Sequence, residues 1–228
     1  TNSSVIAGRL LGVGAAPRPL REIDWLGVVA RMPGALVVRE DGTASLETWI
    51  DAARGAARPL RFGAAPQGSM SELAARCFAQ KTGLALVHAP FSDMHAPYEA
   101  LRRGDIELLV DGLPRVLEEV ARGDMRVLLV TSGERSPSLP GTPAFGELWG
   151  GEDFSDLVLL GVGVTERPRV RSELRHAWEA VARTPAFRNA MVQAGAIVVG
   201  SDSTRAGDDL EAEYLRHARL LARFPPSR

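Results

Sequence analysis

The feature that most constrains the fold is an alternation, repeated along the chain, of short apolar runs with segments of helical periodicity. The runs at 60–63, 84–88 and 106–111 are each followed by a turn and then by apolar residues at helical spacing. Apolar runs of this length are typical of buried strands, and their alternation with helices is typical of α/β proteins. We therefore predict an α/β fold.

Charge and apolar content narrow the classes of function. The chain has 228 residues, with 27 basic and 28 acidic side chains and a net charge of −1. With so small a net charge, the chain has no overall electrostatic attraction to nucleic acid, so we expect no nucleic-acid partner. The chain contains no stretch of 18 apolar residues, so we expect no membrane span. The length allows one large domain or two small lobes, each with its own core.

The C-terminal part of the chain contains two further predicted helices. Pro168 is expected to open the first, with Leu174, Trp178 and Val181 on its inner face. Thr184 is expected to be the N-cap of the second helix, which begins at Pro185. We expect the inner face of this second helix to comprise Phe187, Ala190 and Met191.

The segment Gly63-Ala64-Ala65-Pro66-Gln67-Gly68-Ser69-Met70-Ser71 is the best candidate for a binding site. It runs from a predicted strand into a helix N-terminus, where unpaired amide N–H groups and the helix dipole hold carboxylates or phosphates. Its small residues allow a ligand to approach the backbone, and the hydroxyls of Ser69 and Ser71 add donors. The alternative is purely structural, because Ser69 and Glu72 have the spacing of a capping box.

Asp111 is a second candidate, because it follows a buried strand at the end where α/β sites gather. The alternative role for this residue is to cap the helix that begins near Pro114. The sequence has no Gly-x-Ser-x-Gly elbow, phosphate-binding loop or zinc motif, and no convincing pair of catalytic carboxylates. We therefore expect no catalytic residue, no metal ligand and no cofactor.

Three collinear segments carry a resemblance to a known family. They are His88-Ala89-Pro90-Phe91, residues 101–114 and residues 123–140. They resemble the patterns "HVPYKG", "LLGGQVDLMFDNLPS" and "IKAGKLRALAVTSAKRSPALPDVPT" of the Bug-type solute-binding proteins of tripartite tricarboxylate transporters. Weaker matches extend the resemblance over nearly the whole chain, at 19–23, 61–74, 184–188 and 195–201.

The resemblance implies a two-lobed clamshell of the type II periplasmic-binding-protein kind, with the first lobe incomplete. Residues 1–27 would be a remnant of lobe 1, residues 28–153 would form lobe 2, and residues 154–228 would be the C-terminal part of lobe 1. The family's opening strand and its "PFAPGGSTD" loop have no counterpart here, so we expect the N-terminal portion to be missing.

The resemblance also implies a function. Such a protein captures a small carboxylate, an organic acid or an amino acid, and delivers it to membrane transporter subunits. It would act as a periplasmic monomer, made from a precursor with a signal peptide, and it would not be an enzyme. The alternatives are a ligand-sensing or interaction module on the same fold, a degenerate paralogue that binds nothing, or an enzyme on a similar scaffold.

Matching the family's patterns residue by residue gives an implied ligand-binding set: Asn2, Ser3, Ser4, Ala65, Gln67, Gly68, Ser69, Ser71 and Asp111. Two departures from the patterns affect this set. Glu72 stands where the family often has His, and its carboxylate would repel an anion unless it is paired or solvated. Pro66 replaces a loop glycine and removes one amide donor.

Overall fold

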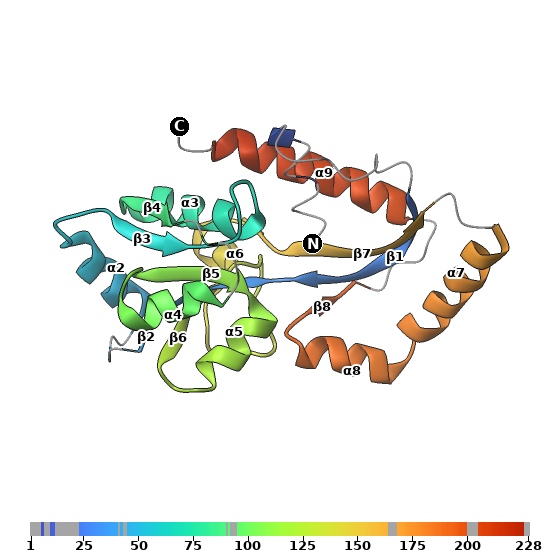
Figure 1. Cartoon of the computed structure of the whole chain (residues 1–228), viewed down its shortest axis with the longest axis horizontal. Coiled ribbons are helices and arrows are strands. Elements are labelled where there is room, and N and C mark those ends of the chain that lie inside the picture. Colours follow the sequence, from blue (N-terminus) through green and yellow to red (C-terminus); the bar gives the residue numbers. More distant parts are fainter. Residues whose placement is uncertain are drawn as a thin grey trace. The chain divides into compact units, whose positions relative to one another are not determined.

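The computed structural model describes residues 6, 10–11, 23–40, 42, 45–89, 91, 95–163, 168–199 and 205–225. The fold is α/β and divides into two compact units (Figure 1). Unit 1 comprises Thr1–Met32 and Asp156–Pro225, and unit 2 comprises Pro33–Ser155. The assignment of residues 1–27, 28–153 and 154–228 to the lobes of a clamshell stays a prediction.

Unit 2 is built on a five-stranded sheet in the order β4-β3-β5-β2-β6. Strands β3, β4 and β5 are parallel to one another, whereas β2 runs antiparallel to both of its neighbours, β5 and β6. The carboxyl ends of β3, β4, β5 and β6 therefore meet at one edge, which we call the strand-end edge. The strands are β2 (Gly34–Arg39), β3 (Leu60–Gly63), β4 (Leu86–Ala89), β5 (Leu108–Gly112) and β6 (Met125–Val130).

The helices of unit 2 follow the predicted pattern, because local signals begin and end them. The Oγ atom of Ser45 accepts from the Thr48 amide at the start of one helix, and Gly83 ends the next at a φ of +73°, as the left-handed cap position requires. These elements are α2 (Leu46–Arg54), α3 (Met70–Thr82), α4 (Ala96–Arg103), α5 (Leu113–Val120) and α6 (Phe145–Trp149).

The sheet of unit 2 is buried on both faces. Ala35, Val37 and Leu109 pack in a core cluster with residues of α4 and α5, such as Tyr98 and Val116. The alternate residues of the same strands lie on the opposite face, because successive side chains of a strand point to opposite faces. Those alternate residues are also fully buried, and they include Leu36, Leu108 and Val110.

Unit 1 contains a three-stranded sheet in the order β7-β1-β8. Its two long strands, β1 (Ile23–Met32) and β7 (Asp156–Gly163), form an antiparallel pair (Figure 1), and β8 (Ile197–Val198) pairs with the other side of β1. The helices of this unit include α7 (Pro168–Ala182), α8 (Pro185–Gln193) and α9 (Ala206–Arg223). Of the helices that the structure describes, none is long and apolar enough to cross a membrane.

The predicted inner faces of α7 and α8 are only partly confirmed. Trp178 is buried as expected, but Leu174 and Val181 are 41% and 50% exposed. In α8 no residue is fully buried: Ala190 is exposed, contrary to the prediction, whereas Phe187 and Met191 are half-buried on the predicted face. The helices themselves form where predicted, because local caps and periodicity favour them. Burial of an apolar face needs a packing partner, and Trp178 has one in Phe187, whose ring centroid lies 5.4 Å away.

A close backbone approach occurs where α6 meets the segment after β6. The Gly146 amide donates to the Ser132 carbonyl oxygen at 3.2 Å. A Cβ atom placed on Gly146 would lie 2.6 Å from the Cα atom of Gly133, closer than Cβ atoms approach backbone in real proteins. Only glycine fits at this contact.

The substitution Gly146→Ala should therefore lower the free energy of unfolding by roughly 1–3 kcal/mol, because the added methyl group pushes two backbone segments apart. Gly141→Ala is the matched control, since its added Cβ meets nothing within 4 Å, and it should change stability by less than about 0.5 kcal/mol. Urea unfolding monitored by tryptophan fluorescence measures both. Equal stability of the two variants would contradict the close approach.

Candidate functional site

The connection from β3 to α3, which we call the β3–α3 corner (residues 64–71), reverses the chain at the strand-end edge. Gly68 adopts a φ of +82°, a left-handed conformation that favours glycine. Ser69 follows in an extended conformation and is the N-cap of α3. This turn begins a 13-residue helix, whose first amides have no acceptor within the helix itself.

Four amides in and near the β3–α3 corner donate within the protein. The Ala65 amide donates to the Ser71 Oγ atom at 3.2 Å, and the Gly68 amide donates to a carboxylate oxygen of Glu72 at 3.0 Å. The Ser69 amide donates to the carbonyl oxygen of Pro66 at 3.0 Å, and the Glu72 amide donates to Ser69 Oγ at 3.3 Å. The capping alternative is therefore partly realised, although the Glu72 carboxylate accepts from Gly68 rather than from the N-cap amide.

Three amides of the same segment have no acceptor. They belong to Gln67, Met70 and Ser71, and none of them donates to any residue that the structure describes. Two of them are the first amides of α3, where the positive end of the helix dipole favours negative charge. The β3–α3 corner thus combines three unused donors with a favourable dipole, which suits a small anion.

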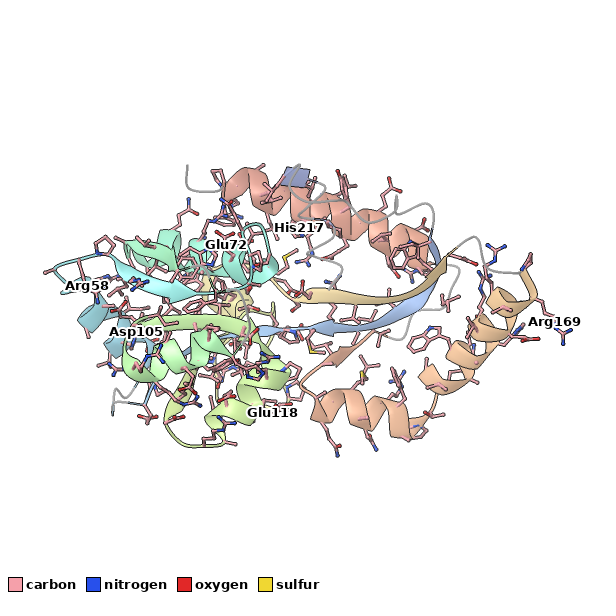
Figure 2. All side chains as sticks on the ribbon, in the orientation of Figure 1. Arg58, Glu72, Asp105, Glu118, Arg169 and His217 are labelled. Carbon is pink, nitrogen blue, oxygen red and sulfur yellow. The ribbon has the colours of Figure 1, made fainter. Side chains whose placement is uncertain are left out.

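The carboxylate of Glu72 is buried and paired, so it does not stand free against an anion. Arg76, one turn further along α3, donates from Nε at 2.5 Å and also from Nη2. The two side chains are only 5% and 12% exposed. Figure 2 shows Glu72 at α3 within unit 2. The unfavourable charge expected from the sequence is therefore neutralised by a residue that sequence reasoning missed.

A cavity of about 520 Å³ borders the β3–α3 corner on the side of α3 and the edge strand β4. Its walls are mainly apolar, and the ring of Phe62 stacks on His88 with centroids 4.9 Å apart. Gln67 is the one predicted site residue that lines it. The full lining is Phe62, Ala64, Pro66, Gln67, Glu72, Arg76, Ala79, Leu86, Val87, His88 and Phe91.

Asp111 lies at the end of β5, on the strand-end edge. Its carboxylate accepts from the hydroxyl of Tyr98 at 2.9 Å, and Nε of Arg115 lies 4.0 Å away. Burial raises the pKa of Asp111 above its usual range, although the hydrogen bonds from Gly112 and Tyr98 oppose this. Burial, together with the nearby Asp111, also raises the pKa of Tyr98, so its hydroxyl remains a donor.

The alternative role of Asp111 as a helix cap is not what the structure shows. The N-cap of α5 is Gly112, and no side chain caps this helix. Tyr98 was not identified from the sequence, because it is 13 residues from Asp111 and reaches it only through tertiary packing. Arg115 carried a weak signal, since it follows Asp111 by four residues at the start of a helix.

The predicted site residues are only partly brought together. The β3–α3 corner holds Ala65, Gln67, Gly68, Ser69 and Ser71, and Asp111 lies at the same edge but does not line the cavity. Asn2, Ser3 and Ser4 lie outside the described residues. Within the described ranges no group of His, Cys, Asp and Glu side chains could hold a metal ion.

A family model described as "Tripartite tricarboxylate transporter family receptor" matches residues 16–222. The chain belongs to this family. Its solute-binding receptors are the class that the sequence patterns indicated, so the Bug-type, TctC-like resemblance is confirmed.

Curated relatives agree with this assignment. A protein from the clcB-clcD intergenic region of Pseudomonas knackmussii is 28% identical over 159 residues, which cover 69% of this chain and 94% of the relative. Protein BugT of Bordetella pertussis is 27% identical over 46% of this chain and 32% of its own length. The chain spans 61% of a further relative, from the tcbD-tcbE intergenic region of a Pseudomonas species.

Solved structures confirm the predicted periplasmic-binding-protein fold. The periplasmic binding protein BugD is 20% identical, with a TM-score of 0.74 over 88% of this chain and 69% of that chain. The structure of an R. palustris protein with adipate has a TM-score of 0.79 and is 23% identical, over 88% of this chain and 68% of that chain. MatC from Rhodopseudomonas palustris with bound malate has a TM-score of 0.79 and is 17% identical, over 96% of this chain and 76% of that chain.

Glu72→Ala should destabilise the chain by about 3 kcal/mol, because it removes one member of a buried ion pair with Arg76 and the carboxylate that accepts from the Gly68 amide. Glu173→Ala is the control. Its ion pair with Arg169 spans four residues as well, but the side chains are 63% and 89% exposed (Arg169 is labelled in Figure 2), and its loss should cost less than about 0.5 kcal/mol. Denaturant unfolding compares the two. Similar losses would refute the buried pair.

The raised pKa of Asp111 predicts a pH dependence of stability. A carboxyl whose folded-state pKa lies above its unfolded value of about 3.9 stabilises the fold below the unfolded pKa and loses this contribution as pH rises through the folded pKa. Asp111→Asn lacks this titration. Its free energy of unfolding, relative to the unsubstituted chain, should therefore increase as pH rises from 4 upward. A difference that stays constant with pH would contradict the shift.

Proposed function

We propose that this chain is the binding component that captures a small organic carboxylate in the periplasm for a tripartite tricarboxylate transporter. The main support for this proposal is a group of three unused amide donors at the N-terminus of α3, those of Gln67, Met70 and Ser71. A carboxylate at this point accepts from the backbone and gains from the helix dipole without needing a dedicated basic side chain.

Two further observations support the proposal. The family to which the chain belongs consists of solute-binding receptors, and two structures that share its fold contain adipate and malate. The charge of Glu72, which would oppose an anion at the β3–α3 corner, is already neutralised by Arg76. The binding residues would be those of the β3–α3 corner together with Asp111, with Asn2, Ser3 and Ser4 as predicted partners.

A pair of substitutions at Ser71 isolates the amide donor. Ser71→Pro removes both the amide N–H and the hydroxyl, whereas Ser71→Ala removes only the hydroxyl. Proline is tolerated in the first turn of a helix, and this chain already has Pro97 and Pro114 at the equivalent second position of α4 and α5. The two variants therefore differ at the ligand mainly by one hydrogen bond.

Isothermal titration with a panel of mono- and dicarboxylates should show binding to the unsubstituted chain. Relative to Ser71→Ala, Ser71→Pro should weaken that binding by roughly tenfold or more, because a hydrogen bond to a charged acceptor is lost. Circular dichroism of both variants confirms the fold. The proposal is rejected if no carboxylate gives heat or thermal stabilisation, and the β3–α3 corner is rejected as the site if the two variants bind equally.

A further inference from the structure

Arg115 is a second group at the strand-end edge with unused capacity to bind an anion. It occupies the third position of α5, immediately after the Gly112 cap and Pro114. Its side chain is 38% exposed, so it reaches solvent, yet its Nη1 atom is buried and has no hydrogen-bond partner. The exposed part of this planar guanidinium is suited to carboxylate recognition, and the buried Nη1 donor still lacks an acceptor.

Asp111 does not satisfy the hydrogen-bonding capacity of the Arg115 guanidinium. The shortest approach, between Arg115 Nε and Asp111 Oδ2, is 4.0 Å, which is too long for a hydrogen bond. The same carboxylate oxygen accepts from the Tyr98 hydroxyl at 2.9 Å. Arg115 therefore lies within ion-pair distance of Asp111 without donating a hydrogen bond to it at the printed distance.

The position of Arg115 relative to the β3–α3 corner follows from the sheet. Strands β3 and β5 are parallel neighbours, with Gly63 paired to Leu109, and neighbouring strands are about 5 Å apart. Residues 64–71 leave the sheet from β3 at this edge, and Asp111 and α5 leave it from β5 at the same edge. Two consecutive positions along one edge thus carry the free amides and the guanidinium.

Arg115 dominates the charge of these two connections. Residues 64–71 contain no charged side chain, and the nearby Glu72 is neutralised by Arg76.

We propose that Arg115 binds the second carboxylate of a ligand whose first carboxylate accepts from the amides of the β3–α3 corner. The chain then favours dicarboxylates over monocarboxylates of the same length. This inference rests on the proposed function, because it assumes that the β3–α3 corner holds the first carboxylate. Arg115 is a specificity residue in this scheme, since it distinguishes ligands that share the first contact.

The test compares matched ligand pairs by isothermal titration: succinate with butanoate, glutarate with pentanoate, and adipate with hexanoate. The unsubstituted chain should bind one dicarboxylate at least tenfold more tightly than its partner. Arg115→Ser should reduce that ratio to within about threefold by weakening only the dicarboxylate. Arg115→Lys, which keeps the charge but loses the planar fork, should give an intermediate ratio.

Arg103→Ser is the control for a general change of charge. Arg103 lies at the end of α4, pairs with Asp105 and is 62% exposed, and its substitution should leave the ratio unchanged. Equal weakening of both ligands by Arg115→Ser, an unchanged ratio, or no preference in the unsubstituted chain would overturn the role of Arg115 while carboxylate binding stands. Absence of binding by all six ligands would overturn the proposed function, and this inference with it.

Discussion

The carboxylate of Glu72 holds the β3–α3 corner together, and the arrangement of the candidate site depends on it. It accepts from the Gly68 amide and from Arg76, so that one side chain fixes the turn before α3 and joins it to the next turn of the helix. Buried amides need acceptors, and a buried carboxylate needs donors. Both needs are met inside the protein, whereas the amides of Gln67, Met70 and Ser71 have no acceptor among the described residues.

The strand-end edge gathers polar groups because of sheet topology. Parallel strands end at the same edge, and each is followed by a helix whose first amides also lie there. In unit 2 this brings together the amides before α3, the carboxyl group of Asp111 and the guanidinium of Arg115, although 51 residues of sequence separate Ala64 from Arg115. The edge combines neutral amide donors, which suit any carboxylate, with a charged group that distinguishes among carboxylates.

The apolar pattern of unit 1 shows the limit of periodicity as evidence for burial. The spacing of Leu174, Trp178 and Val181 correctly predicts a helix, because local propensity and caps determine where a helix forms. The same spacing also predicts an inner face, but only Trp178 is buried. A side chain is buried only when another element covers it, and the sequence of the helix contains no information on whether such an element is present.

The sequence by itself determined the order and kind of the elements, the family, and the β3–α3 corner as a candidate anion site. These follow from signals within a few residues, such as the serine at position 69 and glycine at positions 68 and 83, or from collinear motifs. Tertiary structure alone decided which amides stay free, that Arg76 neutralises Glu72, and that Tyr98 donates to Asp111. Hydrogen bonds and ion pairs depend on ångström-scale distances between side chains, which spacing along the chain does not fix.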